Sequence, residues 1–308
     1  MTTLTAPPTL TTARADWTKR VLWANLIGQI GIIVTGGAVR LTGSGLGCST
    51  WPQCEPGHFT PELHAATSFH QQIEFGNRIV TVLLSAIVIT VAVRVVSLSG
   101  RSRTLRLLGL VPLAGVLAQA VIGGVSVLAG LNPAIVGSHL LISMALVAVA
   151  VLLLVRYHEG DEHPVALVPT VDRRLSWLAG AVAAVVLSLG VVVTGSGPHS
   201  GSTEAAARFD LDPARITPVH SGAVWCFVAL VILLVVRLRR VDVPPARTAV
   251  AALLAVTLAQ GAIGYVQYFT GLPELLVGAH MLGAGLLTAT MAWTILSLRV
   301  RPGVVPRV

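Results

Sequence analysis

Charged residues are scarce in this sequence. Asp, Glu, Lys and Arg together make up 11% of its 308 residues, whereas soluble domains carry about 25%. Hydrophobic residues make up 54% of the chain, and its mean hydropathy is +0.80. This composition excludes an ordinary soluble domain and predicts an integral membrane protein.

Two further signals are missing. Residues 1–19 contain no short apolar core followed by a cleavage site, so we expect a disordered cytoplasmic tail and no signal peptide. The Thr-Gly-Ser-Gly segments at 42–45 and 194–197 are not followed by Lys-Ser or Lys-Thr, which excludes a phosphate-binding loop. These segments instead allow tight helix ends and close helix packing.

Eight apolar stretches are each long enough for a membrane-spanning helix, which needs roughly 20 residues. The links after the even-numbered stretches, together with the two ends of the chain, hold 17 of the 21 Lys and Arg residues. The positive-inside rule therefore predicts that these links and both termini are cytoplasmic, and that the loops 40–76 and 195–218 face outward. The net charge of +8 follows this topology, so no nucleic-acid surface is expected. The stretches lie near 20–39, 77–96, 106–128, 135–155, 175–194, 219–237, 248–269 and 275–298.

The chain contains an internal repeat, in which residues 118–144 align with residues 259–285 at a constant offset of 141. A fixed offset is the mark of a duplicated unit. We therefore predict an all-α membrane protein of two pseudo-symmetric four-helix halves, related by an axis along the membrane normal. The matched pairs are Gln119 and Gln260, Gly123 and Gly264, Gly130 and Gly271, Gly137 and Gly278, and His139 and His280. The expected segments are a tail 1–19, a half 20–156, a cytoplasmic linker 157–174, a half 175–299 and a tail 300–308.

Three histidines, His139, His220 and His280, each lie near the start of an even-numbered span, and so at a similar depth. Ionisable residues in spans are costly and are functional candidates by default, although each could simply be hydrogen-bonded to a neighbouring helix. Zinc would need further ligands that the surrounding apolar helices do not offer, whereas haem needs one or two axial histidines in an apolar slot. Aligning residues 216–220 with 73–77 makes Asn77 the equivalent of His220. The sequence therefore predicts a bis-His haem site in the second half and a mono-His site in the first.

Two charged residues accompany Asn77 at the start of the second span. Glu74 lies one helical turn before Asn77, on the same face, and is a candidate for proton transfer; capping of the helix N-terminus is the alternative. Arg78 is a candidate partner for a propionate, or it reaches the membrane interface with its charged end. His70 precedes Asn77 by seven residues, about 10 Å along a helix, and would reach the same iron only through a broken helix.

The outer loop 40–76 carries Cys48 and Cys54. A close cysteine pair outside the cytoplasm favours a structural disulfide. A thiol-exchange pair and a zinc site with His58 are the alternatives. Cys226 lies inside the sixth span and is expected to be an inert packing residue. Residues 61–72, which include His64, could form an amphipathic helix on the bilayer surface.

Several of these segments together resemble the haem A synthase family, over about residues 20–298. They are the run Gly-Gly-Ala-Val-Arg-Leu-Thr-Gly-Ser-Gly-Leu-Gly-Cys at 36–48, Trp-Pro-Gln-Cys at 51–54, residues 74–78 and the three span histidines. The resemblance implies eight spans, a haem b cofactor held by His220 and His280, and a haem o substrate site near His139, Asn77 and Arg78. It also implies oxidation of a porphyrin methyl group to a formyl group to make haem A for cytochrome oxidase, catalysis by Glu74 and a Cys48–Cys54 disulfide.

One residue departs from the family pattern, which is commonly Glu-x-x-His-Arg: Asn77 stands in place of the histidine. This leaves His139 as the axial ligand expected in the first half. A membrane b-type cytochrome and a haem transporter or chaperone are the alternative functions. A cytochrome that carries electrons across the membrane needs haems near both faces, whereas the span histidines all lie near one. The expected partners are membrane lipid, haem o synthase and cytochrome oxidase assembly factors, and a homo-oligomer is left open.

Overall fold

The computed structural model describes residues 9–61, 69–202 and 207–303. Within these ranges nearly all of the secondary structure is α-helical. Eight helical spans in these ranges are long and apolar enough to cross a membrane. The predicted all-α membrane fold with eight spans is therefore confirmed. The helices are α1 (Thr9–Leu41), α2 (Phe69–Val96), α3 (Arg103–Leu108), α4 (Val111–Leu128), α5 (Pro133–His158), α6 (Thr170–Ser196), α7 (Pro213–Leu238), α8 (Pro244–Phe269) and α9 (Glu274–Leu296). Two short strands, β1 (Val165–Ala166) and β2 (Arg299–Val300), pair antiparallel.

Some boundaries differ from those expected. Helix α1 begins at Thr9, within the segment expected to be a disordered tail. The third span is divided into α3 and α4 at Gly109 and Leu110, and Pro112 occupies the first turn of α4, where a missing N–H costs nothing. Most of the amphipathic helix expected at 61–72, with His64, lies outside the described residues.

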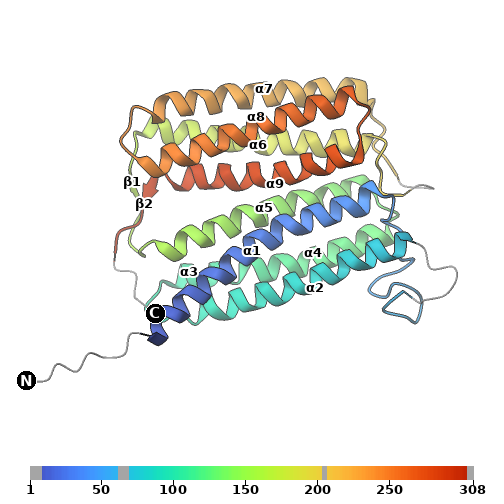
Figure 1. The fold of residues 1–308 in the computed structure, drawn as a ribbon, viewed down its shortest axis with the longest axis horizontal. Coiled ribbons are helices and arrows are strands. Elements are labelled where there is room, and N and C mark those ends of the chain that lie inside the picture. Colours follow the sequence, from blue (N-terminus) through green and yellow to red (C-terminus); the bar gives the residue numbers. More distant parts are fainter. Residues whose placement is uncertain (1–8, 62–68, 203–206, 304–308) are drawn as a thin grey trace, which may run out of the picture.

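The helices form two four-helix bundles that lie side by side (Figure 1). In the first bundle α2 and α5 both pack on α1 and α4, so α2 and α5 face each other across it. In the second, α7 and α9 both pack on α6 and α8 and face each other in the same way. Helix α9 also packs on α1 and α5, and the apolar core of the first bundle around Val147 continues onto α9 through Met281 and Trp293. The bundles therefore share an apolar boundary.

The sequence repeat is also a repeat of backbone conformation. The turn between α4 and α5 places Gly130 and Leu131 at φ values of 60° and 59°, and the turn between α8 and α9 places Gly271 and Leu272 at 80° and 62°. Two successive residues in the left-handed region are rare outside such turns, and glycine adopts that region at little cost. The same tight turn therefore brings His139 and His280 into equivalent positions at one end of the molecule.

The opposite end of the molecule is closed by a charge network around Asp161, in the linker. Nε of Arg101 donates to Asp161 Oδ2 (2.8 Å) and Nη2 of Arg156 donates to Asp161 Oδ1 (3.0 Å). Arg299 pairs with Glu159 at 2.9 Å, which ties the β2 segment to the end of α5. This network and the β1–β2 pairing hold the linker against both bundles.

Replacing Asp161 with Asn is expected to destabilise the protein. Burial alone would raise the pKa of Asp161, but the hydrogen bonds from Arg101 and Ser102 outweigh it and hold that pKa well below its usual range. The variant would leave the buried Arg101 and Arg156 short of an acceptor, at a cost of at least roughly 1–3 kcal/mol. Because the pKa of Asp161 is lower in the folded state, its ionised form stabilises the fold at pH values above the unfolded-state pKa, about 3.9. This stabilisation is lost as the pH falls through the folded-state pKa.

Thermal unfolding in detergent checks this expectation. At pH 7 Asp161→Asn should unfold at a lower temperature than the wild type, and the difference should narrow below about pH 4, the unfolded-state pKa. Asp242→Asn is the matched control, because Asp242 is 95% exposed and contacts Arg247 only at 3.7 Å. Equal unfolding temperatures for Asp161→Asn and Asp242→Asn would contradict a stabilising network.

Candidate haem-binding cavity

A cavity of about 460 Å³ lies in the first bundle, at the end that carries the Cys48–Cys54 loop. Helices α1, α2, α4 and α5 contribute most of its walls, which are largely apolar. Four of the predicted site residues line it: Glu74, Asn77, Arg78 and His139. The structure therefore brings together side chains from α2 and α5 that are far apart in the sequence.

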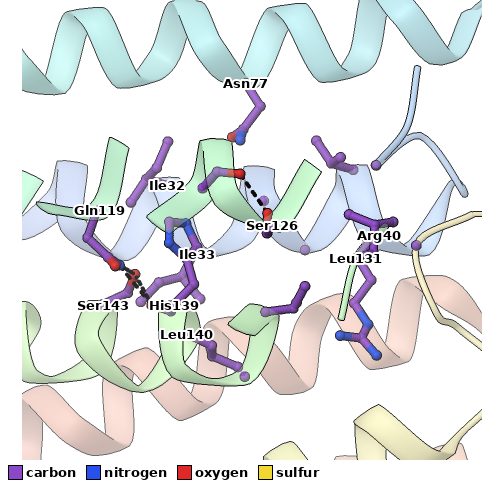
Figure 2. A pocket seen from close by; sticks show the side chains of 18 of the residues that line it. Ile32, Ile33, Arg40, Asn77, Gln119, Ser126, Leu131, His139, Leu140 and Ser143 are labelled. Carbon is purple, nitrogen blue, oxygen red and sulfur yellow. Dashed lines mark hydrogen bonds between the residues drawn. The ribbon is translucent and has the colours of Figure 1, made fainter. Parts of the chain in front are cut away.

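His139 and Asn77 point toward one another across this cavity, from α5 and α2 (Figure 2). Asn77 Oδ1 accepts a hydrogen bond from Thr35 on α1 (2.7 Å). The part of the amide left for the cavity is its NH2 group, which donates hydrogen bonds and has no lone pair suited to iron. Among these two side chains, only His139 has the chemistry of an axial ligand.

The backbone of His139 is fixed by a second repeated residue. Nε2 of Gln119, on α4, donates to the carbonyl oxygen of His139 at 2.7 Å (Figure 2). In the second bundle Nε2 of Gln260, on α8, donates to the carbonyl oxygen of His280 at 3.0 Å. The constant offset of 141 marked both glutamines, but the sequence alone did not indicate what they contact.

His220 and His280 lie near the starts of the facing helices of the second bundle. His220 is the eighth residue of α7, and His280 is the seventh residue of α9. Nδ1 of His220 is 3.1 Å from the carbonyl oxygen of Val186 on α6. A proton held on Nδ1 by this carbonyl leaves Nε2 free as a ligand atom, the arrangement common in metal-binding histidines.

Each span histidine packs edge-on against a glycine of a neighbouring helix. A Cβ atom at Gly123 would lie 3.4 Å from Cε1 of His139, and one at Gly264 would lie 3.3 Å from Cε1 of His280. Gly190 has the same relation to His220, also at 3.3 Å. Glycine at these positions leaves room for the ring to lie between helices, with its nitrogens available to a ligand in the bundle.

His280 also lines the cavity of the first bundle, together with Val277 and Met281 of α9. The sequence assigned this histidine to the second half alone. The structure places it on the boundary between the bundles, because α9 packs on both. A group held by His280 would therefore lie next to the first-bundle cavity.

Glu74 and Arg78 hydrogen-bond to the outer loop at the mouth of the cavity. Glu74 is 5% exposed; its Oε1 accepts from Nη2 of Arg78 (2.6 Å) and its Oε2 accepts from the backbone N–H of Cys48 (2.8 Å). Arg78 also donates to the carbonyl oxygens of Thr50 (3.1 Å), Pro52 (3.2 Å) and Gln53 (3.1 Å). Both charged groups therefore hold the loop, and Arg78 faces the cavity with its charge already paired.

The remaining candidates lie apart from the cavity or differ from expectation. Cys48 and Cys54 form a disulfide and are both buried, so the predicted bond is confirmed. Nδ1 of His70 is 3.0 Å from Oγ of Ser44, which engages this histidine with the loop. Cys226 is exposed on α7, not packed as expected, because it lies on the outer surface of the bundle. Among the described residues no three His, Cys, Asp or Glu side chains converge on a common metal position.

Residues 19–197 match the model of the COX15-CtaA family, described as cytochrome oxidase assembly protein. The chain belongs to this family. The match covers the first bundle and α6, so His220 and His280 lie outside it.

Curated relatives of this COX15-CtaA member carry the name heme A synthase. The protein from Alkalihalophilus pseudofirmus is 30% identical over 212 residues, which are 67% of this chain and 69% of that protein. The one from Lysinibacillus sphaericus is 32% identical over 178 residues, 56% and 55% of the two chains. The one from Halalkalibacterium halodurans is 27% identical over 201 residues, 64% and 65% of the two chains.

The residues of this COX15-CtaA member fit axial ligation of haem. Nδ1 of His139 and Nδ1 of His280 are buried and have no hydrogen-bond partner among the described residues, so protein groups do not account for the full bonding capacity of these rings. Glycines give each ring its place between helices, and the walls of the first-bundle cavity, which His139 and His280 both line, are largely apolar. His220 and His280 would hold a haem in the second bundle, and His139 would hold one in the first.

Proposed function

We propose that this protein is a haem A synthase, a membrane oxidoreductase that converts a methyl group of haem o into a formyl group. The observation that carries the proposal is the asymmetry of the two bundles. In the second bundle both of the facing helices α7 and α9 carry a histidine near their start, His220 and His280, whereas in the first bundle α5 carries His139 and the facing helix α2 carries Asn77, with a large cavity between them. Two strong axial ligands suit a resident haem b, and one suits a haem that must enter and leave.

In this proposal the first bundle binds the substrate. His139, positioned by Gln119, ligates the iron of haem o, and the apolar walls receive the rest of the macrocycle. His220 and His280 would hold haem b, which would supply one-electron redox chemistry and pass the substrate's electrons on to an external acceptor. The position of His280 on the cavity wall supports a short path between the two groups.

The reaction is a four-electron oxidation. A methyl group and one water give a hydroxymethyl group, two protons and two electrons. The hydroxymethyl group then loses two more protons and two more electrons to give the formyl group. Glu74 is the carboxylate nearest the mouth of the cavity on α2, so we assign it to proton transfer. Its hydrogen bonds to Arg78 and to the N–H of Cys48 fix its orientation.

We also propose an orientation of the protein in the membrane and two kinds of partner protein. Both termini and the Arg-rich links lie on the cytoplasmic side, and the disulfide loop and cavity mouth lie on the outer side. Haem o synthase is the partner expected to supply the substrate, and cytochrome oxidase assembly factors are expected to receive the product.

The test is chromatography of haems extracted from cells that make haem o and express the protein. The wild type should accumulate haem A, and His139→Ala should lose most of it, because the substrate loses its axial ligand. His199→Ala is the matched control, since the ring of His199 lies in the loop after α6 with Glu274 at 3.7 Å. Haem o that is bound but never converted by the wild type would indicate a transporter or chaperone and would overturn the proposal.

A further inference from the structure

A second arginine lines the cavity, at the end of α1. Nε of Arg40 donates to the carbonyl oxygen of His199 (2.7 Å), and its Nη2 donates to that of Thr194 (2.9 Å). Both acceptors are neutral backbone groups at the end of α6 and in the loop that follows. Within the described part of the chain Arg40 has no carboxylate partner, and its Nη1 makes no hydrogen bond.

The other charges of the cavity wall cancel. Glu74 and Arg78 form an ion pair at 2.6 Å, and the remaining donors of Arg78 go to carbonyl oxygens of the loop. Arg40 therefore gives the wall an excess of one positive charge. A charge that is largely removed from water without an opposite charge beside it is unfavourable, and an anionic ligand would compensate it. A guanidinium binds a carboxylate well because two N–H groups can donate to its two oxygens.

We propose that Arg40 binds a propionate carboxylate of the tetrapyrrole in this cavity, an inference that rests on the proposed function. Ile33, His139 and Arg40 all line the cavity, and Figure 2 shows Arg40 farther along α1 toward the loop than Ile33. Seven residues of helix separate Ile33 from Arg40, about 10 Å. That spacing is comparable to the reach from the centre of a porphyrin to its propionate groups.

This contact sets the orientation of the substrate. With a propionate at Arg40, the carboxylate edge of the porphyrin faces the disulfide loop, and the opposite edge points deeper into the bundle. The deeper part of the cavity is lined by Leu84, Val116 and Leu146. These apolar side chains suit the isoprenoid tail of haem o. Arg78, for which the sequence predicted the propionate contact, keeps its contacts with the loop.

The competing explanation is that Arg40 only joins the two bundles, by binding the last carbonyl groups of α6. A pair of ligands separates the two roles. Zinc protoporphyrin IX takes a single axial ligand and carries two free carboxylates, whereas its dimethyl ester has the same ring without the charges. A loss of structure weakens the binding of both ligands, but loss of a carboxylate contact weakens only that of the free acid.

The experiment is a fluorescence titration of the purified full-length protein in lipid nanodiscs with each porphyrin. The preference for the free acid is the Kd of the ester divided by the Kd of the free acid. We expect this preference to be about 10- to 100-fold larger in the wild type than in Arg40→Gln, which is the value of a charge-assisted hydrogen bond. Partitioning of each porphyrin into the bilayer is common to both proteins and cancels in this ratio. Arg40→Lys should retain part of the preference. Arg208→Gln should retain all of it, because Arg208 is exposed in the neighbouring loop and, among the described residues, hydrogen-bonds only to the carbonyl oxygen of Pro198 (3.1 Å).

The outcomes distinguish the two proposals. If both porphyrins bind and Arg40→Gln keeps the preference of the wild type for the free acid, the role of Arg40 is wrong and the proposed function stands. If His139→Ala does not weaken the binding of either porphyrin, the cavity is not the porphyrin site, and the proposed function fails with it. If Arg40→Gln does not fold, Arg40→Lys is compared with the wild type instead. An equal preference for the free acid over the ester in these two proteins would overturn the inference.

Discussion

His280→Ala is expected to yield a protein that purifies without haem b and makes no haem A. His280 lies near the start of α9, which is opposite the helix of His220 in the second bundle, and its backbone carbonyl accepts a hydrogen bond from Gln260. Loss of hydrogen-bonding groups behind a metal ligand already lowers affinity about 10- to 100-fold, so removal of a ligand itself should lower haem retention by at least that factor. His220→Ala should behave in the same way. The absorbance of the purified protein and the haem extracted from it are the measurements.

His158→Ala is the control for this prediction. His158 also lies on a spanning helix, but Nδ1 of its ring contacts the carbonyl oxygen of Leu154 of the same helix (2.8 Å), at the far end of the bundle. It should retain haem and activity. His139→Ala should retain haem b and lose only conversion of haem o. A full complement of haem b in both His220→Ala and His280→Ala would rule out the second-bundle site.

Glu74→Gln is expected to reduce the rate of haem A formation by about 10²- to 10⁴-fold, the usual contribution of a positioned acid–base group. The amide can still accept the hydrogen bond from the N–H of Cys48, so the loop keeps this contact, but the side chain no longer exchanges a proton. Arg78→Gln removes contacts with the loop and leaves the carboxylate in place. If Glu74 transfers protons, Glu74→Gln should therefore be the slower of the two variants.

Glu55→Gln provides the matched control, because Glu55 is a carboxylate of the same loop whose Oε1 accepts from Nε2 of Gln71 on α2 (2.6 Å). Its activity should remain close to that of the wild type. The measurement is the time course of haem A in extracts, with the amount of folded protein determined in parallel. Undiminished haem A formation by Glu74→Gln would assign Glu74 to holding the loop alone.

Much of the architecture could be predicted because the signals are local. Length and hydropathy define each span, and the offset of 141 places His139 and His280 at equivalent points of two bundles. The family resemblance was confirmed by the match over residues 19–197. For Cys48 and Cys54, spacing left a disulfide and a zinc site with His58 open, and the structure shows the disulfide.

The contacts of the arginines could not be predicted in the same way. Arg40 lies at the end of α1 and Arg78 lies in the third turn of α2, and the sequence pointed to Arg78 as the propionate partner because it follows Glu74 and Asn77. Their roles depend on how the two outer loops fold back: the 48–54 loop covers Arg78, whereas Arg40 reaches the end of α6 in the other bundle. Such contacts between distant segments arise only once the bundles have packed.

The shared boundary formed by α9 has a consequence for the origin of the molecule. This helix completes one bundle and supplies Val277, His280 and Met281 to the cavity of the other. The two copies of the ancestral unit are therefore no longer interchangeable modules. The first half expressed alone would lack the side of its cavity that α9 supplies, so the interior of one copy is finished by a helix of the other.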